Sequence, residues 1–88
     1  MNIAESIENK LMQALEPSFL QVIDESHQHI GHVGSRAEGE SHFRVRISAE
    51  KLKSLSKVKQ HQEIYKILAE DMDSNNPKAI HALVIEIL

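Results

Sequence analysis

Apolar residues near the start of the chain recur every four positions, a spacing typical of one face of a helix. The positions concerned are Ile3, Ile7, Leu11 and Leu15. Asn2 is a suitable N-cap, because its side-chain oxygen can accept a hydrogen bond from the first helical turn. Pro17 ends the pattern, since proline disrupts a continuing helix. The pattern therefore predicts an amphipathic helix between Asn2 and Pro17, with its apolar stripe facing the core.

Two short segments in the first half of the chain have the composition and alternation of β-strands. Residues 19–24 (FLQVID) are a short apolar run that includes two adjacent β-branched residues. Residues 42–48 (HFRVRIS) alternate, so that the apolar residues Phe43, Val45 and Ile47 face one side. The polar segment between these strands contains three glycines and three histidines. A loop of this length in a small domain is often functional.

The second half of the chain is predicted to contain a main helix and a final strand. Residues 48–55 are interpreted as a short helical turn, and Ser56 is a suitable cap for the helix that follows. The inner face of that helix is expected to consist of Val58, Tyr65, Leu68, Ala69 and Met72. After the turn signal DSNNP, residues 78–88 alternate as a strand. One face of this strand is expected to hold His81, Leu83, Ile85 and Ile87, and the other Ile80, Ala82 and Val84.

These elements predict a single α+β domain over residues 1–88, with the order αββαβ. The first two strands should pair antiparallel across the long loop. The last helix and strand form a crossover, so the last strand should return parallel to the second strand with right-handed chirality. We expect a three-stranded mixed sheet with both main helices on one face.

Composition excludes several classes of site. The chain has no cysteine, so it forms neither a disulfide nor a thiolate metal site of its own. The net charge is −3, but residues 44–66 carry seven basic and two acidic groups. A local basic patch is therefore expected, without attraction of the whole molecule to nucleic acid. Since the sequence contains no secretory signal and no apolar run of membrane-spanning length, we expect a cytoplasmic protein without membrane contact.

Six histidines in 88 residues are the candidates for chemistry. Three of them, His27, His29 and His32, lie in the long loop, where they either bind a metal or form part of a solvated polar segment. His81 is set in the apolar sequence Ile80-His81-Ala82-Leu83, where the alternative is a hydrogen-bonded core or edge histidine. His42 and His61 are interpreted as structural. No nucleophile elbow, paired-carboxylate or phosphate-binding glycine motif is present, so the sequence does not predict an enzyme.

Several short motifs, taken in order, resemble those of the BolA family over nearly the whole chain. They are Pro17-x-x-Leu20, Asp24-Glu25-Ser26-x-x-His29, Gly31-His32-x-Gly34, Ser41-His42-Phe43, Ser56-x-Val58-x-x-His61 and Ile80-His81-Ala82-Leu83. The resemblance implies a fold similar to class II KH domains. The chain departs from the family in having Gln60-His61-Gln62 in place of Arg-His-Arg, in having Leu52-Lys53-Ser54 in place of Phe-x-Gly, and in stopping at Leu88 without the usual tail. These departures weaken the case for nucleic-acid binding.

The resemblance also implies a partner and a cofactor. BolA-like proteins are adaptors for monothiol glutaredoxins, and the pair can share a bridging [2Fe–2S] cluster with a glutaredoxin cysteine and a glutathione thiolate. The implied ligands on this chain are His81 and the loop residue His29, with His32 and His27 as rivals. The two histidines can share an iron only if the sheet order brings the loop beside the last strand. We expect no cluster in the isolated chain, which should be a monomer or a weak homodimer.

Two other functions remain open at the level of sequence. Some BolA relatives act on transcription, so a KH-like nucleic-acid-binding regulator is the first alternative. A KH domain grips nucleic acid through a Gly-x-x-Gly loop, and this spacing occurs only at Gly31-x-x-Gly34, between strands rather than helices. The second alternative is a pH or free-metal sensor formed by the loop histidines alone.

Overall fold

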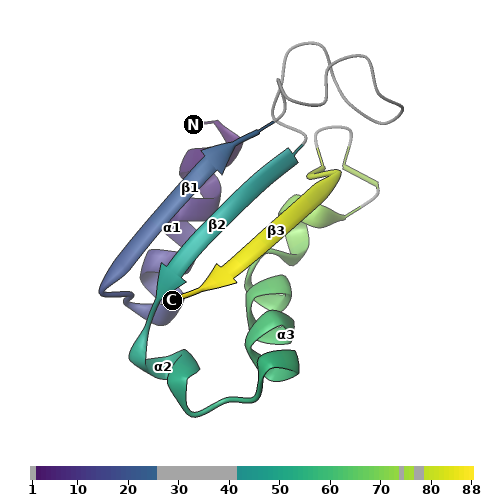
Figure 1. Ribbon diagram of the computed structural model, residues 1–88. Helices are drawn as coiled ribbons and strands as arrows, with labels where there is room; N and C mark the ends of the chain where they lie inside the picture. The colour runs from purple at the N-terminus through teal and green to yellow at the C-terminus, as the bar shows by residue number, and fades with distance from the viewer. Residues whose placement is uncertain (1, 26–41, 74, 77–78) are drawn as a thin grey trace.

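A three-stranded sheet with helices on one side forms the framework of the molecule (Figure 1). The computed structural model describes residues 2–25, 42–73, 75–76 and 79–88. Its elements, in chain order, are α1 (Ile3–Leu15), β1 (Phe19–Asp24), β2 (His42–Ser48), α2 (Glu50–Lys53), α3 (Lys57–Ile67), the short 3₁₀ helix η2 (Ala69–Met72) and β3 (Ala82–Ile87). The predicted α+β class and the αββαβ order of the main elements are confirmed, and α2 is the expected short helical turn.

The strand order is β1-β2-β3, with β2 in the centre. β1 pairs antiparallel with β2, so that Val22 lies opposite Val45. β3 pairs parallel with β2, and this register sets His42 opposite Ala82. Both pairings agree with the prediction from the sequence. Because parallel strands start at the same edge of a sheet, the first residues of β2 and β3 are neighbours.

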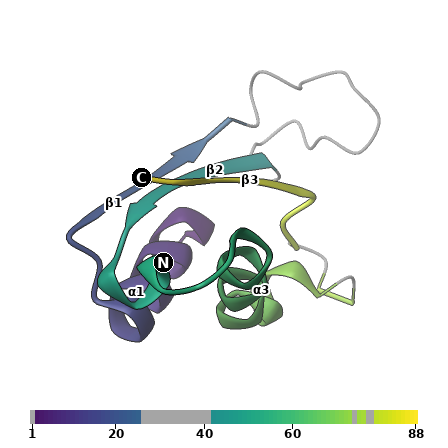
Figure 2. The same ribbon diagram turned by 60° about the horizontal axis from the view of Figure 1, so that its bottom comes forward.

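The core lies between the sheet and the two main helices, which cover the same face of the sheet (Figure 2). The predicted alternation of β2 is confirmed, since its three apolar side chains are buried and its polar ones are half-buried. The buried core consists of Ile7, Leu11, Leu15, Phe43, Val45, Ile47, Ala49, Leu52, Ile64, Leu68 and Ile80. Two helix caps also match the sequence, because Asn2 and Ser56 each accept a hydrogen bond from the backbone N–H three residues later.

The expected inner face of the second main helix is only partly correct. Leu68 is fully buried and Met72 packs against the core, as expected. Val58 and Tyr65 are instead 66% and 41% exposed, and the fully buried Ile64 was not predicted to face the core. A helix advances about 100° per residue, so a stripe chosen one position away from the buried one faces a different direction. The helix also ends at Ile67 and is followed by η2, so the predicted face does not continue through a single helix.

The start of the last strand also differs from the prediction. β3 begins at Ala82, and Ile80 is 4% exposed and belongs to the core. Ile80 was expected on the face opposite to Leu83, but it precedes the strand and does not follow its alternation. Its backbone N–H donates to the carbonyl oxygen of Asp71 at 2.7 Å, which ties this residue to η2. His81 is exposed and does not share the partly buried environment of Leu83.

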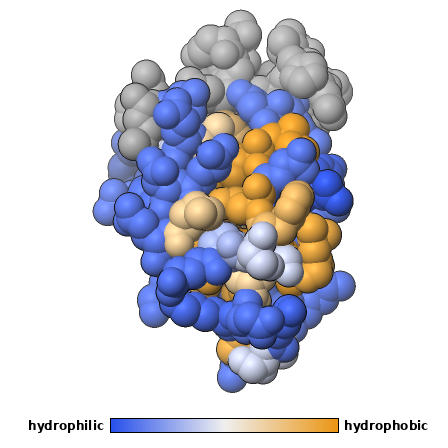
Figure 3. All heavy atoms as spheres, turned by 90° about the vertical axis from the view of Figure 1, so that its left-hand side faces the viewer, coloured by the Kyte–Doolittle hydropathy of each residue, from blue (hydrophilic) through white to orange (hydrophobic). Residues whose placement is uncertain are grey.

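The surface carries apolar side chains as well as polar ones. Seen from the side that carries β1, apolar atoms lie among hydrophilic ones (Figure 3). Among the large exposed hydrophobic residues are Met12 on α1 and Phe19 on β1, which are 50% and 44% exposed. Within the described ranges, no helix has both the length and the apolar character needed to cross a bilayer.

Candidate functional site

His81 stands at the surface immediately before β3, and its neighbours in sequence hold it in place. Ile80 is buried in the core, and Ala82 begins the strand that pairs with β2. The hydrogen bond from the Ile80 backbone N–H to the Asp71 carbonyl oxygen fixes the backbone just before His81. The Asp71 carboxylate is itself held by Lys10, whose ammonium group donates to it at 2.8 Å. An exposed imidazole is thus presented from a well-anchored backbone.

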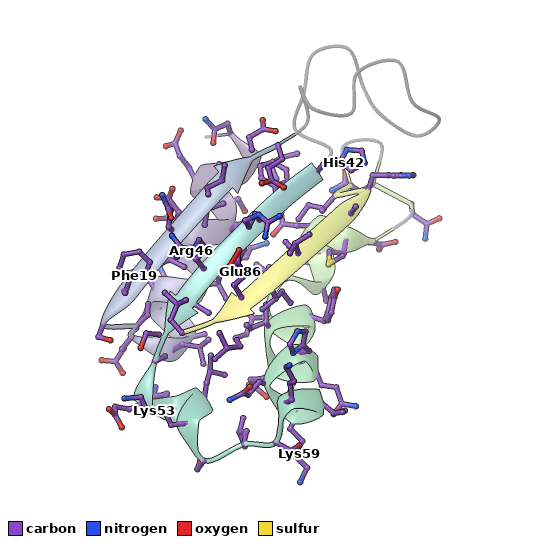
Figure 4. All side chains as sticks on the ribbon, in the orientation of Figure 1. Phe19, His42, Arg46, Lys53, Lys59 and Glu86 are labelled. Atoms are coloured by element: carbon purple, nitrogen blue, oxygen red, sulfur yellow. The ribbon has the colours of Figure 1, made fainter. Side chains whose placement is uncertain are left out.

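His42 lies directly beside His81. The centroids of the two imidazole rings are 5.5 Å apart, and the rings are tilted by 57°. His42 is the first residue of β2 and pairs with Ala82 across the parallel ladder, at the upper end of the sheet in Figure 4. The sequence-based interpretation of His42 as merely structural missed this proximity. The signal that identifies it is the crossover itself, because parallel β2 and β3 must start at the same edge.

The loop histidines His27, His29 and His32 lie outside the described residues. The residues that flank this segment, Glu25 and His42, are described, and they meet at the same edge of the sheet as His81. The backbone N–H of Glu25 donates to the carbonyl oxygen of His42 at 2.8 Å. Glu25 and His42 therefore lie next to each other at the edge where β2 and β3 begin, and the prediction that a loop histidine joins His81 stays a prediction.

A chain of ion pairs crosses the open face of the sheet below the two histidines. The Arg44 guanidinium donates to Glu25 at 2.8 Å and to Glu86 at 2.6 Å, so it links β2 to β3 and to the residue that directly follows β1. Arg46 lies 3.8 Å from Glu86 and donates to Gln21 at 3.0 Å (Figure 4). The hydrogen bonds to Glu25 and Glu86 raise the pKa of Arg44 above its ordinary value. These carboxylates are engaged by guanidinium groups and hold the strands together.

The described residues of this edge offer imidazole nitrogens as metal ligands. His42 and His81 form a pair, and no cluster of three or more His, Asp or Glu residues suited to a metal occurs in the described part of the chain. Imidazole suits zinc, copper and iron. Two such ligands make up half of a four-coordinate site, so the remaining ligands must come from another source. This donor set fits a metal or cluster that is completed by a partner.

His61 is not part of this pair. It lies on α3, and its Nδ1 atom is 2.9 Å from the carbonyl oxygen of Lys57, one helical turn earlier. Together with Lys57, Val58, Gln62 and Tyr65 it lines an open groove of about 440 Å³ on the exposed side of the helix. The position of His61 agrees with the structural role expected from the sequence.

Comparisons with known proteins identify relatives over almost the whole chain. A family model described as BolA-like protein matches residues 11–88. An uncharacterised protein in the cobS 5′ region of Sinorhizobium is 42% identical, over 98% of this chain and 89% of its own length. The DNA-binding transcriptional regulator BolA of Escherichia coli is 38% identical, over 97% of this chain and 73% of its own length.

Solved structures show the same architecture. The BolA domain of SufE1 from Arabidopsis thaliana is 37% identical to this chain, and the two superpose with a TM-score of 0.80. The superposition covers 96% of this chain and 87% of that domain. The fold predicted from the order of helices and strands is therefore confirmed by an independent structure.

Proposed function

This chain belongs to the BolA-like protein family, and on that basis we propose that it is an adaptor that pairs with a monothiol glutaredoxin and shares a bridging [2Fe–2S] cluster with it. The resemblance found in the sequence is confirmed by the family match. The similarity to the BolA domain of SufE1 agrees with a role related to iron–sulfur proteins. The proposed role is binding and transfer in the cytoplasm, without catalysis.

The observation that carries this proposal is the exposed imidazole of His81. A residue in the middle of an apolar sequence is ordinarily buried, yet His81 is exposed while its neighbour Ile80 is only 4% exposed. An exposed ligand on an anchored backbone is open to a cluster carried by another protein. The chain has no cysteine, so its contribution to an iron must come from nitrogen or oxygen ligands.

The second ligand on this chain is proposed to be His29, with His32 and His27 as rival candidates. This assignment comes from the family resemblance. It is supported by the described ends of the segment, which start and finish at the edge of the sheet where His81 stands. Two imidazoles in place of two thiolates on one iron are known from Rieske centres, where they raise the reduction potential. The cluster would be completed by a glutaredoxin cysteine and glutathione.

Anaerobic reconstitution tests this function directly. The chain is mixed with a monothiol glutaredoxin, glutathione, iron and sulfide, and the heterodimer is isolated and examined by visible absorption and circular dichroism. We expect a [2Fe–2S] spectrum that differs from that of the glutaredoxin homodimer. His81→Ala should abolish this difference, while His81→Cys should retain a cluster with a lower reduction potential, because a thiolate replaces an imidazole.

His61→Ala is the matched control, since His61 is a partly exposed histidine whose ring contacts the backbone of its own helix. Its heterodimer spectrum should equal that of the unmodified chain. An unchanged spectrum in His81→Ala would exclude the proposed ligand, and the absence of any heterodimer with glutaredoxin would exclude the adaptor function.

A second candidate function is nucleic-acid binding, and two observations favour it. The Escherichia coli relative is named a DNA-binding transcriptional regulator. On α3, Lys57, Lys59 and Lys66 are exposed and form no ion pair with any residue in the described ranges. These lysines lie within the basic segment found in the sequence.

The salt dependence of binding to duplex DNA tests this candidate. Affinity for DNA falls as the salt concentration rises, and each phosphate contact adds about 0.9 to the magnitude of the slope of log affinity against log salt. Replacing the three lysines by glutamine should therefore lower the slope by about 3 if they contact phosphates. Failure of the unmodified chain to bind duplex DNA at low salt would rule this function out.

A further inference from the structure

The pair of imidazoles at the start of β2 and β3 has a property that does not depend on a partner protein. We propose that His42 and His81 together bind a late first-row divalent cation, such as Zn²⁺, Cu²⁺ or Ni²⁺, on this chain alone. The site is distinct from the loop histidines, because both of its ligands come from residues that flank or begin strands of the sheet.

The separation of the two rings matches that required by a shared metal ion. A zinc–nitrogen bond is about 2.0–2.1 Å, and the ring centre lies about 1.1 Å beyond the nitrogen, so the metal is about 3.2 Å from each centroid. At nitrogen–metal–nitrogen angles of about 110–120°, the two centroids are then about 5.2–5.5 Å apart. The observed centroid separation is 5.5 Å.

The backbone at this position is already arranged for binding. His42 pairs with Ala82 in the parallel ladder, so the backbone of His42 lies opposite the residue that directly follows His81. Ile80, which is buried, fixes the residue before His81. The backbone that carries both imidazoles is therefore anchored on either side of His81 and at His42.

The donor type defines the class of ion. Imidazole nitrogen favours zinc, copper and nickel, whereas magnesium and calcium require oxygen ligands. The carboxylate of Glu25, whose backbone bonds to His42, is engaged by Arg44 at 2.8 Å and is not needed as a ligand. Because His81 is exposed, water can occupy the remaining coordination positions. The site is accordingly an open, exchangeable one.

Binding of such a cation has a consequence that rests on the proposed function. His81 is the proposed cluster ligand, and one imidazole nitrogen lone pair cannot serve two metals. Zinc on His42 and His81 would then compete with the shared cluster for this chain. The cation site itself is measured without glutaredoxin, so its failure is distinguishable from failure of the adaptor function.

Isothermal titration of the full chain with Zn²⁺, and electron paramagnetic resonance of the Cu²⁺ form, test the site. The Cu²⁺ spectrum should show coupling to two imidazole nitrogens. His42→Asn and His81→Asn should each weaken Zn²⁺ binding by about tenfold or more, since each removes one of two ligands. The control His61→Asn should bind Zn²⁺ as the unmodified chain does. Far-ultraviolet circular dichroism verifies that each variant is folded.

The loop histidines provide the decisive counter-test. A variant in which His27, His29 and His32 are all replaced by asparagine keeps His42 and His81, and we expect it to retain the two-nitrogen Cu²⁺ signal. Loss of cation binding in this variant would assign the ion to the loop and overturn the proposal. Undiminished Zn²⁺ affinity in His42→Asn would also overturn it, as would the absence of Zn²⁺ binding by the unmodified chain at millimolar concentration.

Discussion

Truncation of Ile80 should both destabilise the domain and disturb the histidine beside it. Ile80 is 4% exposed, so Ile80→Ala removes three carbon atoms from an environment that excludes water almost completely. At about 0.8 kcal/mol per buried carbon, the transfer cost is about 2.4 kcal/mol. Incomplete collapse of the cavity adds to this, which gives a total of about 3 kcal/mol. In a domain of this size the unfolding midpoint should fall by roughly 12–24 °C.

A matched core variant separates loss of stability from loss of position. Ile7→Ala on α1 removes the same atoms from a fully buried site, so its thermal cost should be similar. Ile7 belongs to a helix, whereas Ile80 directly precedes His81 and ties it to the core. Thermal unfolding gives the two costs, and the imidazole proton resonances in the NMR spectrum report on His42 and His81 at 25 °C.

We expect Ile80→Ala to shift the imidazole resonances of both histidines and Ile7→Ala to leave them close to their original positions. A cost below about 1 kcal/mol for Ile80→Ala would show that this side chain does not fill the core as described. Equal imidazole shifts in the two variants would refute the argument that Ile80 positions His81, even if both variants were strongly destabilised.

Three further predictions test other parts of the structure. Val58→Ser should change the free energy of unfolding by no more than about 0.5 kcal/mol in denaturant titrations, because Val58 is 66% exposed; a cost of several kcal/mol would restore the inner face expected from the sequence. Asn2→Ala should cost about 1 kcal/mol, since it removes the acceptor for the Glu5 N–H, and an unchanged thermal midpoint would contradict the capping role. Arg44→Gln should lower the thermal midpoint more in dilute buffer than in 1 M salt, because salt screens partly exposed ion pairs, and a salt-independent cost would point to packing alone. The hydrogen bonds that raise the pKa of Arg44 stabilise the fold as long as the guanidinium is protonated, and this contribution is lost only in strongly alkaline solution, so the effect of the substitution should be equal at about pH 7 and about pH 9.

The sequence predicted the order of the elements and the pairing of the strands because both depend on local pattern and on chain connectivity. The alternation of β2 identified its buried face correctly, since a strand has only two faces and only one of them was apolar. α3 offered several stripes of mixed polarity, and the sheet on which the helix packs decides that Ile64, and not Val58 or Tyr65, is buried. Local periodicity does not contain that information.

The candidate site was predicted in part for a similar reason. His81 was identified by its apolar surroundings and by family resemblance, both of which are properties of a short stretch of sequence. The proximity of His42 depends on the register between β2 and β3, and a shift of the register would separate the two rings. The exposure of His81 likewise depends on where β3 starts. The alternation of the sequence predicted that this strand starts earlier than Ala82, where it begins in the structure.

The topology of the sheet explains why ligands gather at this edge. β2 and β3 run parallel and start side by side, which brings His42 and His81 together although they are far apart in the sequence. The pairing of β1 with β2 brings Glu25, and with it the start of the histidine-containing segment, to the same edge. The pairing of β2 with β3 fixes the position of His42 relative to the start of β3, and His81 beside it is exposed to solvent. Because the chain has no cysteine, any thiolate ligand at such a site must come from a partner or from a small molecule. Under the two proposals made above, a cation and a shared cluster would compete for His81, and their affinities and concentrations would decide which of them occupies it.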